Sequence, residues 1–165
     1  SYKFNTIVTA CPHCYNTLKN EYPELGGNFS VLHHSEYILQ LIEAGQIKPL
    51  AGEKRKVTFH DPCYLGRYNQ IFSAPRKVLA SIPDVQLLEM RNTQSKSNCC
   101  GAGGGQIWQE DKRREKVSAL RLQEAIRIKP DIIASACPLC LVTLTDASCR
   151  LESDIKNLDI AEMIL

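Results

Sequence analysis

Short apolar runs alternate with amphipathic stretches along most of the chain. The runs are rich in β-branched residues and predict buried strands at residues 5–10, 29–32, 56–60, 86–90 and 131–136. The stretches between them predict helices at residues 12–21, 35–46, 74–82 and 109–128, and another helix after Cys137. Strands that alternate with helices in this way are typical of an α/β fold with a mostly parallel sheet.

Prolines and cysteines lie close to the ends of these predicted elements. Pro12 is in the favoured first turn of its helix, and Pro130 ends the long helix before the last strand. Cys11, Cys63 and Cys137 each follow a predicted strand. Because functional sites of parallel sheets lie at the carboxyl ends of the strands, we expect the chemistry of this protein there.

The sequence contains a repeat at a constant offset of 126 residues. Matching positions run without a gap from the pair Ile7 and Ile133 to the pair Leu39 and Leu165, and they include the two C-x-x-C motifs. A repeat of this kind indicates one supersecondary unit used twice. We therefore interpret residues 1–50 as the end of a first cysteine-rich repeat and residues 51–165 as a second, complete one. The alternative is a complete small protein in which one of two sites has decayed.

Composition narrows the class of protein without identifying it. The 165 residues are 44% hydrophobic and 23% charged with a net charge of +2, which gives no argument for nucleic acid or an anionic membrane as partner. No apolar run approaches the ~20 residues of a membrane span, and the first residues do not resemble a signal peptide. Eight cysteines without a secretion signal favour metal or redox chemistry in a reducing compartment, which predicts a cytoplasmic protein.

Five of the cysteines form a pattern that packing does not require. Cys63 is separated by 35 residues from the adjacent pair Cys99 and Cys100, and 36 further residues lead to the C-x-x-C of Cys137 and Cys140. A metal cluster explains this spacing, because thiolates from several loops must then converge on one point. A C-x-x-C where a strand leads into a helix also favours thiolate, because the helix N-terminus offers unpaired N–H groups and a partial positive charge.

The adjacent cysteines precede a glycine-rich loop at residues 101–105. Neighbouring side chains of an extended chain point to opposite faces, so both cysteines reach one centre only if the backbone bends, which glycine permits. The loop also lets a bulky cofactor approach the main chain. Five thiolates exceed the four of an ordinary cubane cluster or zinc site, which favours an unusual iron–sulfur cluster and leaves zinc open. A phosphate-binding loop is the weaker alternative, because the Lys of a P-loop is missing.

Three segments resemble the cysteine-rich CCG domain family. They are His60–Asn69, Cys99–Gly105 and Ala136–Cys140, and the resemblance extends over nearly the whole chain. The family includes catalytic subunits of heterodisulfide reductase, iron–sulfur subunits of glycolate and lactate oxidases, and membrane-bound oxidoreductases between electron-transfer flavoprotein and quinone. The stretch around Cys63 looks most similar to the flavoprotein–quinone branch.

The resemblance implies a fold, a cofactor and a set of ligands. The fold would be a pair of Rossmann-like α/β lobes, and the cofactor a [4Fe-4S] cluster, which is non-cubane in heterodisulfide reductase. The implied ligands are Cys63, Cys99, Cys100, Cys137 and Cys140, and the glycines expected at the cofactor are Gly101, Gly103 and Gly104. Cys11 and Cys14 would belong to a second, partial site. No catalytic residue is implied.

The resemblance also implies partners, and rival functions remain beside it. The expected role is electron transfer within an oxidoreductase, from a flavoprotein or related donor to a quinone or disulfide acceptor, with an upstream lobe of the same polypeptide as neighbour. Membrane association would come from upstream sequence. The rivals are a structural zinc module and a thiol–disulfide oxidoreductase that uses Cys11 and Cys14. His60 either donates a hydrogen bond to the cluster or is a structural residue at a strand end.

Overall fold

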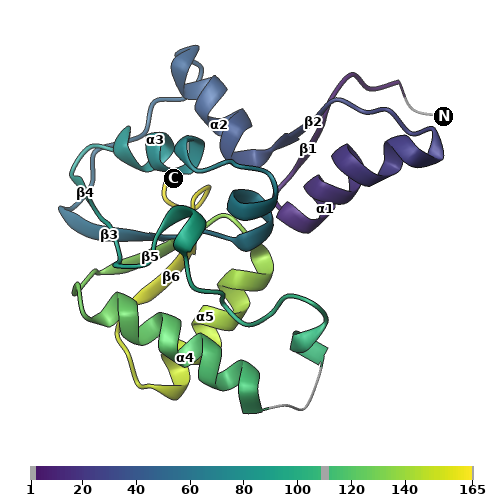
Figure 1. Cartoon of the computed structure of the whole chain (residues 1–165). Helices are drawn as coiled ribbons and strands as arrows, with labels where there is room; N and C mark the ends of the chain where they lie inside the picture. The colour runs from purple at the N-terminus through teal and green to yellow at the C-terminus, as the bar shows by residue number, and fades with distance from the viewer. Residues whose placement is uncertain (1–2, 109–111, 165) are drawn as a thin grey trace.

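The computed structural model describes residues 3–108 and 112–164 and contains two parallel sheets (Figure 1). The larger sheet has the strand order β4–β3–β5–β6, with all neighbours parallel. Its strands are β3 (Arg55–His60), β4 (Val85–Leu88), β5 (Ile132–Ser135) and β6 (Lys156–Asp159). The smaller sheet pairs β1 (Ile7–Thr9) with β2 (Val31–His33). The predicted α/β fold with a mostly parallel sheet is therefore confirmed.

Helices connect the strands, as the hydrophobic pattern predicts. They are α1 (Pro12–Asn16), α2 (His34–Glu43), α3 (Ser73–Ala80), α4 (Lys112–Ile126) and α5 (Pro138–Arg150). The path of α1 continues through a π-helical turn (Thr17–Glu21) and a 3-10 turn (Tyr22–Leu25). A further π-helical turn spans Tyr64–Tyr68, and short 3-10 turns span Gln94–Lys96 and Gln106–Trp108. The start of the long predicted helix, residues 109–111, lies outside the described residues.

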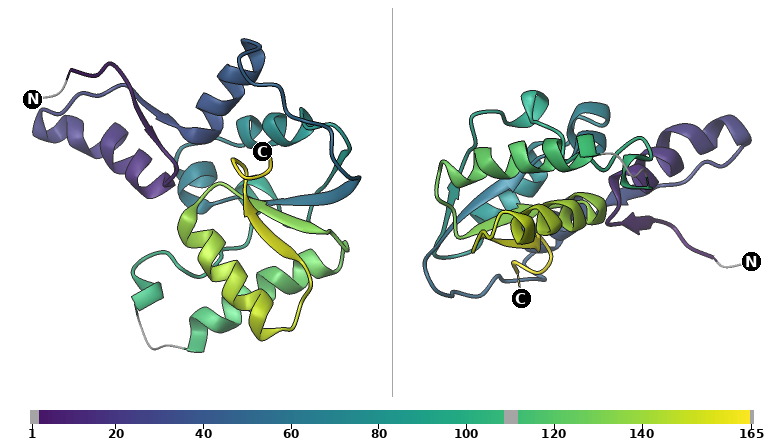
Figure 2. Two further views of the ribbon diagram at one scale, coloured as in Figure 1. Left: turned by 180° about the vertical axis from the view of Figure 1, so that it is seen from behind. Right: turned by 90° about the horizontal axis from the view of Figure 1, so that it is seen from below.

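The larger sheet has an apolar core on each face, because successive side chains of β5 point in opposite directions. Ile133 packs with Leu122 of α4 and with Leu144 and Ala147 of α5. Ile132 and Ala134 belong to the other core, together with Phe59 of β3 and Leu79 of α3. Helices therefore cover the sheet on both sides, and in Figure 2 the strands lie between them. Both faces of the strands are therefore packed against apolar side chains.

The repeat seen in the sequence is present in the strand pairing. Ile7 is paired with Val31 in the smaller sheet, and Ile133 is paired with Asn157 in the larger one. Each residue of the second pair lies 126 positions after its counterpart in the first pair. In Figure 1, β1, β2 and α1 project away from the larger sheet.

The turn after the second strand of each pair also repeats. Glu36 accepts a hydrogen bond from the His33 N–H at 3.2 Å, and Glu162 accepts one from the Asp159 N–H at 2.7 Å. Each pair is separated by three residues, as in a capping box, and the two pairs are offset by the same 126 positions. These two turns contact each other directly, because His34 Nε2 and Asp159 Oδ1 lie 2.9 Å apart.

The structure also corrects some predicted boundaries. The strand expected at 29–32 is at Val31–His33, and the helix after it already begins at His34. The strand at Lys156–Asp159 was not predicted from the hydrophobic pattern. It is short and has two charged ends with a single apolar residue, Leu158, so only the repeat indicates it.

Candidate metal–thiolate site

The cysteines lie at the carboxyl edge of the sheets. Cys63 follows β3 by three residues, and Cys137 follows β5 by two. Cys99 and Cys100 lie in the segment between β4 and α4. Since β3, β4 and β5 are parallel neighbours, their carboxyl ends meet at one edge of the sheet. The topology therefore brings together side chains that are far apart in the sequence.

Cys137 and Cys140 are placed by the first turn of α5. Cys137 is the residue before the helix, and Pro138 occupies its first turn, where a missing N–H leaves no partner unsatisfied. A hydrogen bond from Cys140 lowers the pKa of Cys137 to about 5 despite burial, and the N–H groups of Leu139 and Cys140 act in the same direction. Cys137 therefore ionises more readily than an ordinary cysteine, and the thiolate is the form that binds metal.

A backbone turn at Gly101 places the adjacent cysteines. Gly101 has a φ of 90°, a conformation that favours glycine, and its N–H donates to Cys99 Sγ at 3.2 Å. Hydrogen bonds from Cys100 and Cys63 lower the pKa of Cys99 to about 2. The bend that was expected from the glycine-rich loop is therefore present, and it allows both thiols to reach the site.

Contacts between thiols link all five cysteines into one group. Cys63 contacts Cys99, which contacts Cys100. Cys100 in turn contacts Cys140, and Cys140 contacts Cys137. Their burial ranges from intermediate for Cys63 and Cys99 to buried for the other three.

The pKa shifts within the group run in opposite directions. While Cys99 and Cys137 ionise easily, the hydrogen bond to Cys99 raises the pKa of Cys63 well above its ordinary value. The hydrogen bond to Cys100 likewise raises the pKa of Cys140. Thiolates that lie together repel one another, so all five ionise together only if a cation joins them. The donor set and its charge therefore fit a positively charged inorganic centre.

The group is open to solvent on one side. A cavity of about 640 Å³ is lined by Cys63, Cys99, Gly101, Gly103 and Gly104, and also by Tyr64, Arg67, Tyr68, Gln106 and Val117. A methyl group added at Gly103 or Gly104 would meet no atom within 4 Å, so no neighbouring side chain covers the main chain there. Tyr64 and Tyr68 stack with ring centroids 4.4 Å apart and form one wall. The three glycines expected at a cofactor thus line the cavity beside two of the cysteines.

A buried polar network supports the site from the inner side. His60, at the end of β3, and Arg121, on α4, are each only 1% exposed. The Arg121 Nε–H donates to His60 Nδ1 at 3.0 Å, and the guanidinium also pairs with Glu124 at 2.9 Å. Burial and the nearby guanidinium lower the pKa of His60 to about 3, so the imidazole is neutral at pH 7. Arg121 was missed in the sequence, where it is one of several basic residues of an amphipathic helix.

The second pair, Cys11 and Cys14, lies at the start of α1 and close to the first group. Cys14 is exposed and Cys11 is partly buried. His13 Nδ1 is 4.0 Å from Cys11 Sγ, and the same ring interacts with Cys137. Partial desolvation and a hydrogen bond with Cys11 raise the pKa of Cys14. The two C-x-x-C motifs of the repeat are therefore neighbours in space, with His13 between them.

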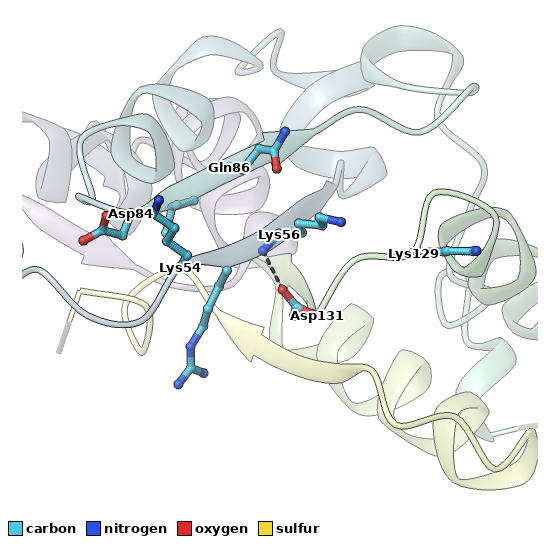
Figure 3. Close-up of a pocket in the computed structure, with 8 residues that line it drawn as sticks. Lys54, Lys56, Asp84, Gln86, Lys129 and Asp131 are labelled. Atoms are coloured by element: carbon cyan, nitrogen blue, oxygen red, sulfur yellow. Dashed lines mark hydrogen bonds between the residues drawn. The ribbon is translucent and has the colours of Figure 1, made fainter.

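A different cavity, of about 450 Å³, opens at the other end of the sheet (Figure 3). Its lining residues include Lys56 of β3, Lys54 just before that strand, and Lys129 in the segment after α4. The Lys56 N–H donates to the Asp131 carboxylate at 2.7 Å. The described residues that line it include no cysteine or histidine. The cysteine group therefore lies at the opposite end of the sheet from this cavity.

Comparison with known proteins bears on the family of the chain. The profile of the CCG family, a cysteine-rich domain, matches residues 57–145. The chain is 41% identical to the probable iron-sulfur-binding oxidoreductase FadF of Bacillus subtilis, covering 96% of this chain and 23% of that protein. It is 34% identical to the EtfAB:quinone oxidoreductase of Syntrophomonas wolfei, covering 99% of this chain and 24% of that protein.

A relative from Methanosarcina barkeri is matched over a larger share of its own length. The chain is 37% identical to one subunit of the dihydromethanophenazine:CoB–CoM heterodisulfide reductase of that organism, covering 96% of this chain and 39% of the relative. The chain thus spans between about a quarter and two fifths of these relatives. The profile match contains all five grouped cysteines and more than half of the chain, and the chain therefore belongs to the CCG cysteine-rich domain family.

Proposed function

We propose that this chain binds an iron–sulfur cluster of the [4Fe-4S] type, non-cubane in form, and carries electrons within a larger oxidoreductase. The observation that carries the proposal is the convergence of Cys63, Cys99, Cys100, Cys137 and Cys140 on one group. When bound, such a cluster takes up and releases one electron at a time. Five thiolates exceed what tetrahedral zinc uses, which supports iron–sulfur chemistry.

The residues of the chain would bind, orient and partly shield the cluster. The pKa values of Cys99 and Cys137 are lowered within the group, so these two residues would offer thiolate most readily. The N–H groups of Gly101 and of the first turn of α5 would hold their sulfurs in place. The open cavity at Cys63 and Cys99 would give a partner or a small acceptor access to the cluster edge.

The names of the relatives support a place between a flavoprotein, or a related donor, and a quinone or disulfide acceptor. One relative is called an EtfAB:quinone oxidoreductase and another is a subunit of a heterodisulfide reductase. In the described residues, no helix has the length and apolar character needed to cross a bilayer. We infer a cytoplasmic position for this part of the protein, with any membrane attachment in other parts of the polypeptide.

We also propose that residues 1–50 are the end of a first cysteine-rich repeat, with Cys11 and Cys14 as its share of a second site. In the larger sheet β5 lies between β3 and β6. Its counterpart β1 pairs, among the described residues, with β2 alone. The free edge of β1 therefore has room for a strand equivalent to β3, contributed by an upstream lobe.

A zinc module is the second candidate, and one observation favours it. Ligand atoms of His60, Cys100 and Cys140 lie within 4.8 Å of one another, and all three residues are buried. The hydrogen bond from Arg121 opposes it, because His60 Nδ1 is already an acceptor and the proton of the neutral ring is then on Nε2. Neither nitrogen is free to bind zinc while that hydrogen bond is kept.

Quantification of iron, acid-labile sulfide and zinc in the anaerobically purified chain, together with EPR spectroscopy, tests the proposal. We expect iron and sulfide in wild type, and loss of most of both in Cys100→Ser, because the removed thiol contacts two others of the group. The control is Cys149→Ser, whose thiol is exposed on α5 and should leave the content unchanged. Stoichiometric zinc without iron would show the structural module instead. Disulfide exchange that depends on Cys11, in a chain without iron, would show the thiol oxidoreductase.

A further inference from the structure

His60 is buried against the cysteine group without being one of its thiols. One of its ring nitrogens lies within 4.8 Å of the sulfurs of Cys100 and Cys140. The ring is 1% exposed, so water does not reach it freely. The cysteine pattern does not account for a histidine at this point, and the contacts of the ring show what it can do.

Arg121 decides which ring nitrogen carries the proton. Its Nε–H donates to His60 Nδ1 at 3.0 Å, and arginine has no acceptor atom, so Nδ1 must hold the lone pair. In a neutral imidazole the proton is then on Nε2. This is a consequence of donor and acceptor chemistry and does not depend on a titration.

Other contacts prevent Arg121 from turning away. One terminal nitrogen donates to the Asn92 carbonyl at 2.8 Å and to Glu124 at 2.9 Å. The other donates to Ser97 Oγ at 3.1 Å. All three guanidinium nitrogens are thus engaged in the interior, and the orientation of the donor toward His60 is fixed.

The Nε2–H group itself has no partner. It is buried, and among the residues that the structure describes no atom accepts its hydrogen bond. A buried donor without an acceptor costs about 1–3 kcal/mol, so such groups are rare unless a ligand completes them. The sulfur atoms of a bound cluster can accept a hydrogen bond and could supply the acceptor that Nε2–H needs. Cys100 and Cys140 would hold such a cluster next to the ring.

We propose that His60 donates an N–H···S hydrogen bond from Nε2 to the bound cluster, or to the sulfur of Cys100 or Cys140 that ligates it, and that Arg121 is the positioning residue that fixes this tautomer. The inference rests on the proposed function. A hydrogen bond to sulfur stabilises the reduced form, which carries more negative charge. His60 would therefore raise the reduction potential of the cluster.

The tautomer can be tested without any cluster. In the chain labelled with ¹⁵N-histidine, kept reduced and metal-free, a long-range ¹H–¹⁵N spectrum distinguishes a protonated Nε2 from a protonated Nδ1. We expect the Nε2–H form for the signal that disappears in His60→Gln. In Arg121→Met that signal should shift toward the Nδ1–H form, because the donor to Nδ1 is gone. An Nδ1–H form in wild type overturns the inference and leaves the proposed function standing.

The effect on the cluster is tested by an EPR-monitored redox titration of the iron-loaded chain. His60→Leu removes the donor and should shift the midpoint potential to a more negative value. His60→Gln keeps an N–H donor and should lie between His60→Leu and wild type. The control is His34→Leu, which removes a buried imidazole that contacts Asp159, and its potential should equal that of wild type.

The possible results separate the two claims. Equal potentials in wild type and His60→Leu overturn the inference alone. A chain that takes up no iron overturns the proposed function together with the inference. If His60→Leu fails to fold, the comparison of wild type with His60→Gln and the tautomer spectrum still decide the matter.

Discussion

At the scale of single residues, the buried carboxylate of Asp61 next to the cysteine edge is paired with a guanidinium through both of its oxygens. Asp61 follows β3 directly, its side chain is 3% exposed, and Arg76 donates to both of its oxygens at 2.7 and 2.9 Å. Burial raises the pKa of Asp61, but the hydrogen bonds and the charge of Arg76 outweigh it, so the pKa is lowered from its ordinary value. The Gln94 N–H donates to the same carboxylate at 2.8 Å and thereby anchors the segment that leads to Cys99.

Removing Arg76 should therefore destabilise the fold strongly. We expect Arg76→Met to lower the free energy of unfolding by about 3–5 kcal/mol at pH 7, because it leaves the buried Asp61 carboxylate without the cation that pairs with it. The control is Arg55→Met. Arg55 pairs with Glu53 at an N–O distance of 3.4 Å, and the Glu53 side chain is 87% exposed, so we expect a loss below about 1 kcal/mol. Urea unfolding of both variants and wild type measures these losses. Equal losses in the two variants would contradict a special role for the buried pair.

The loss in Arg76→Met should also depend on pH. Because the folded pKa of Asp61 is below its ordinary value, the ion pair stabilises the fold above about pH 4, and this contribution disappears as the pH falls through the folded pKa. The difference between wild type and Arg76→Met should thus be largest at neutral pH and shrink as the pH falls through the acidic range, where Asp61 becomes protonated. Burial lowers the pKa of His33 to about 3, which weakens the fold below pH 6.5 in both chains and cancels in the difference. A difference that grows toward low pH would contradict this sign.

At the scale of elements, the turn that follows Cys63 depends on one close packing contact. Gly66 lies within the turn Tyr64–Tyr68, which carries Cys63 at its start and both tyrosines of the cavity wall. A methyl group at Gly66 would lie 2.5 Å from Cε1 of Phe72, the residue just before α3. The ring of Phe72 is thus in the place that a side chain at this position would need.

Gly66→Ala should consequently be costly although it adds only one methyl group. We expect a loss of about 1–3 kcal/mol in the free energy of unfolding, because the tightly packed ring must shift. Gly52→Ala is the matched control, since nothing lies within 4 Å of the added atom and its effect should be within about 0.5 kcal/mol. Denaturant unfolding of the two variants measures both effects. A Gly66→Ala chain as stable as wild type would show that the turn adapts freely.

Most elements could be predicted because their hydrophobic pattern is strong, and the exceptions have physical reasons. β5 is buried on both faces and reads as a continuous apolar run, whereas β6 has charged ends and little apolar surface. The positions of Cys11, Cys63 and Cys137 at strand ends were predictable, because each of them follows a predicted strand within a few residues. Arg121 was not, because its role depends on which helix face meets β3, and that is set by tertiary packing.

At the scale of the whole molecule, the parallel topology explains why distant thiols form one site. Neighbouring strands β3 and β5 end at the same edge, so Cys63 and Cys137 approach one another across 74 positions of sequence. The repeat adds a second thiol pair nearby, through the equivalent end of β1. The arrangement places two C-x-x-C motifs side by side, with His13 between their sulfurs.

The central claim is that five sulfurs hold one inorganic centre, and native mass spectrometry of the anaerobically purified chain tests it most directly. We predict a single adduct with the mass of a cluster of four irons and four sulfides, which is lost in Cys140→Ser and retained in Cys149→Ser. A zinc-only adduct in wild type, or an iron–sulfur adduct that survives in Cys140→Ser, would contradict it.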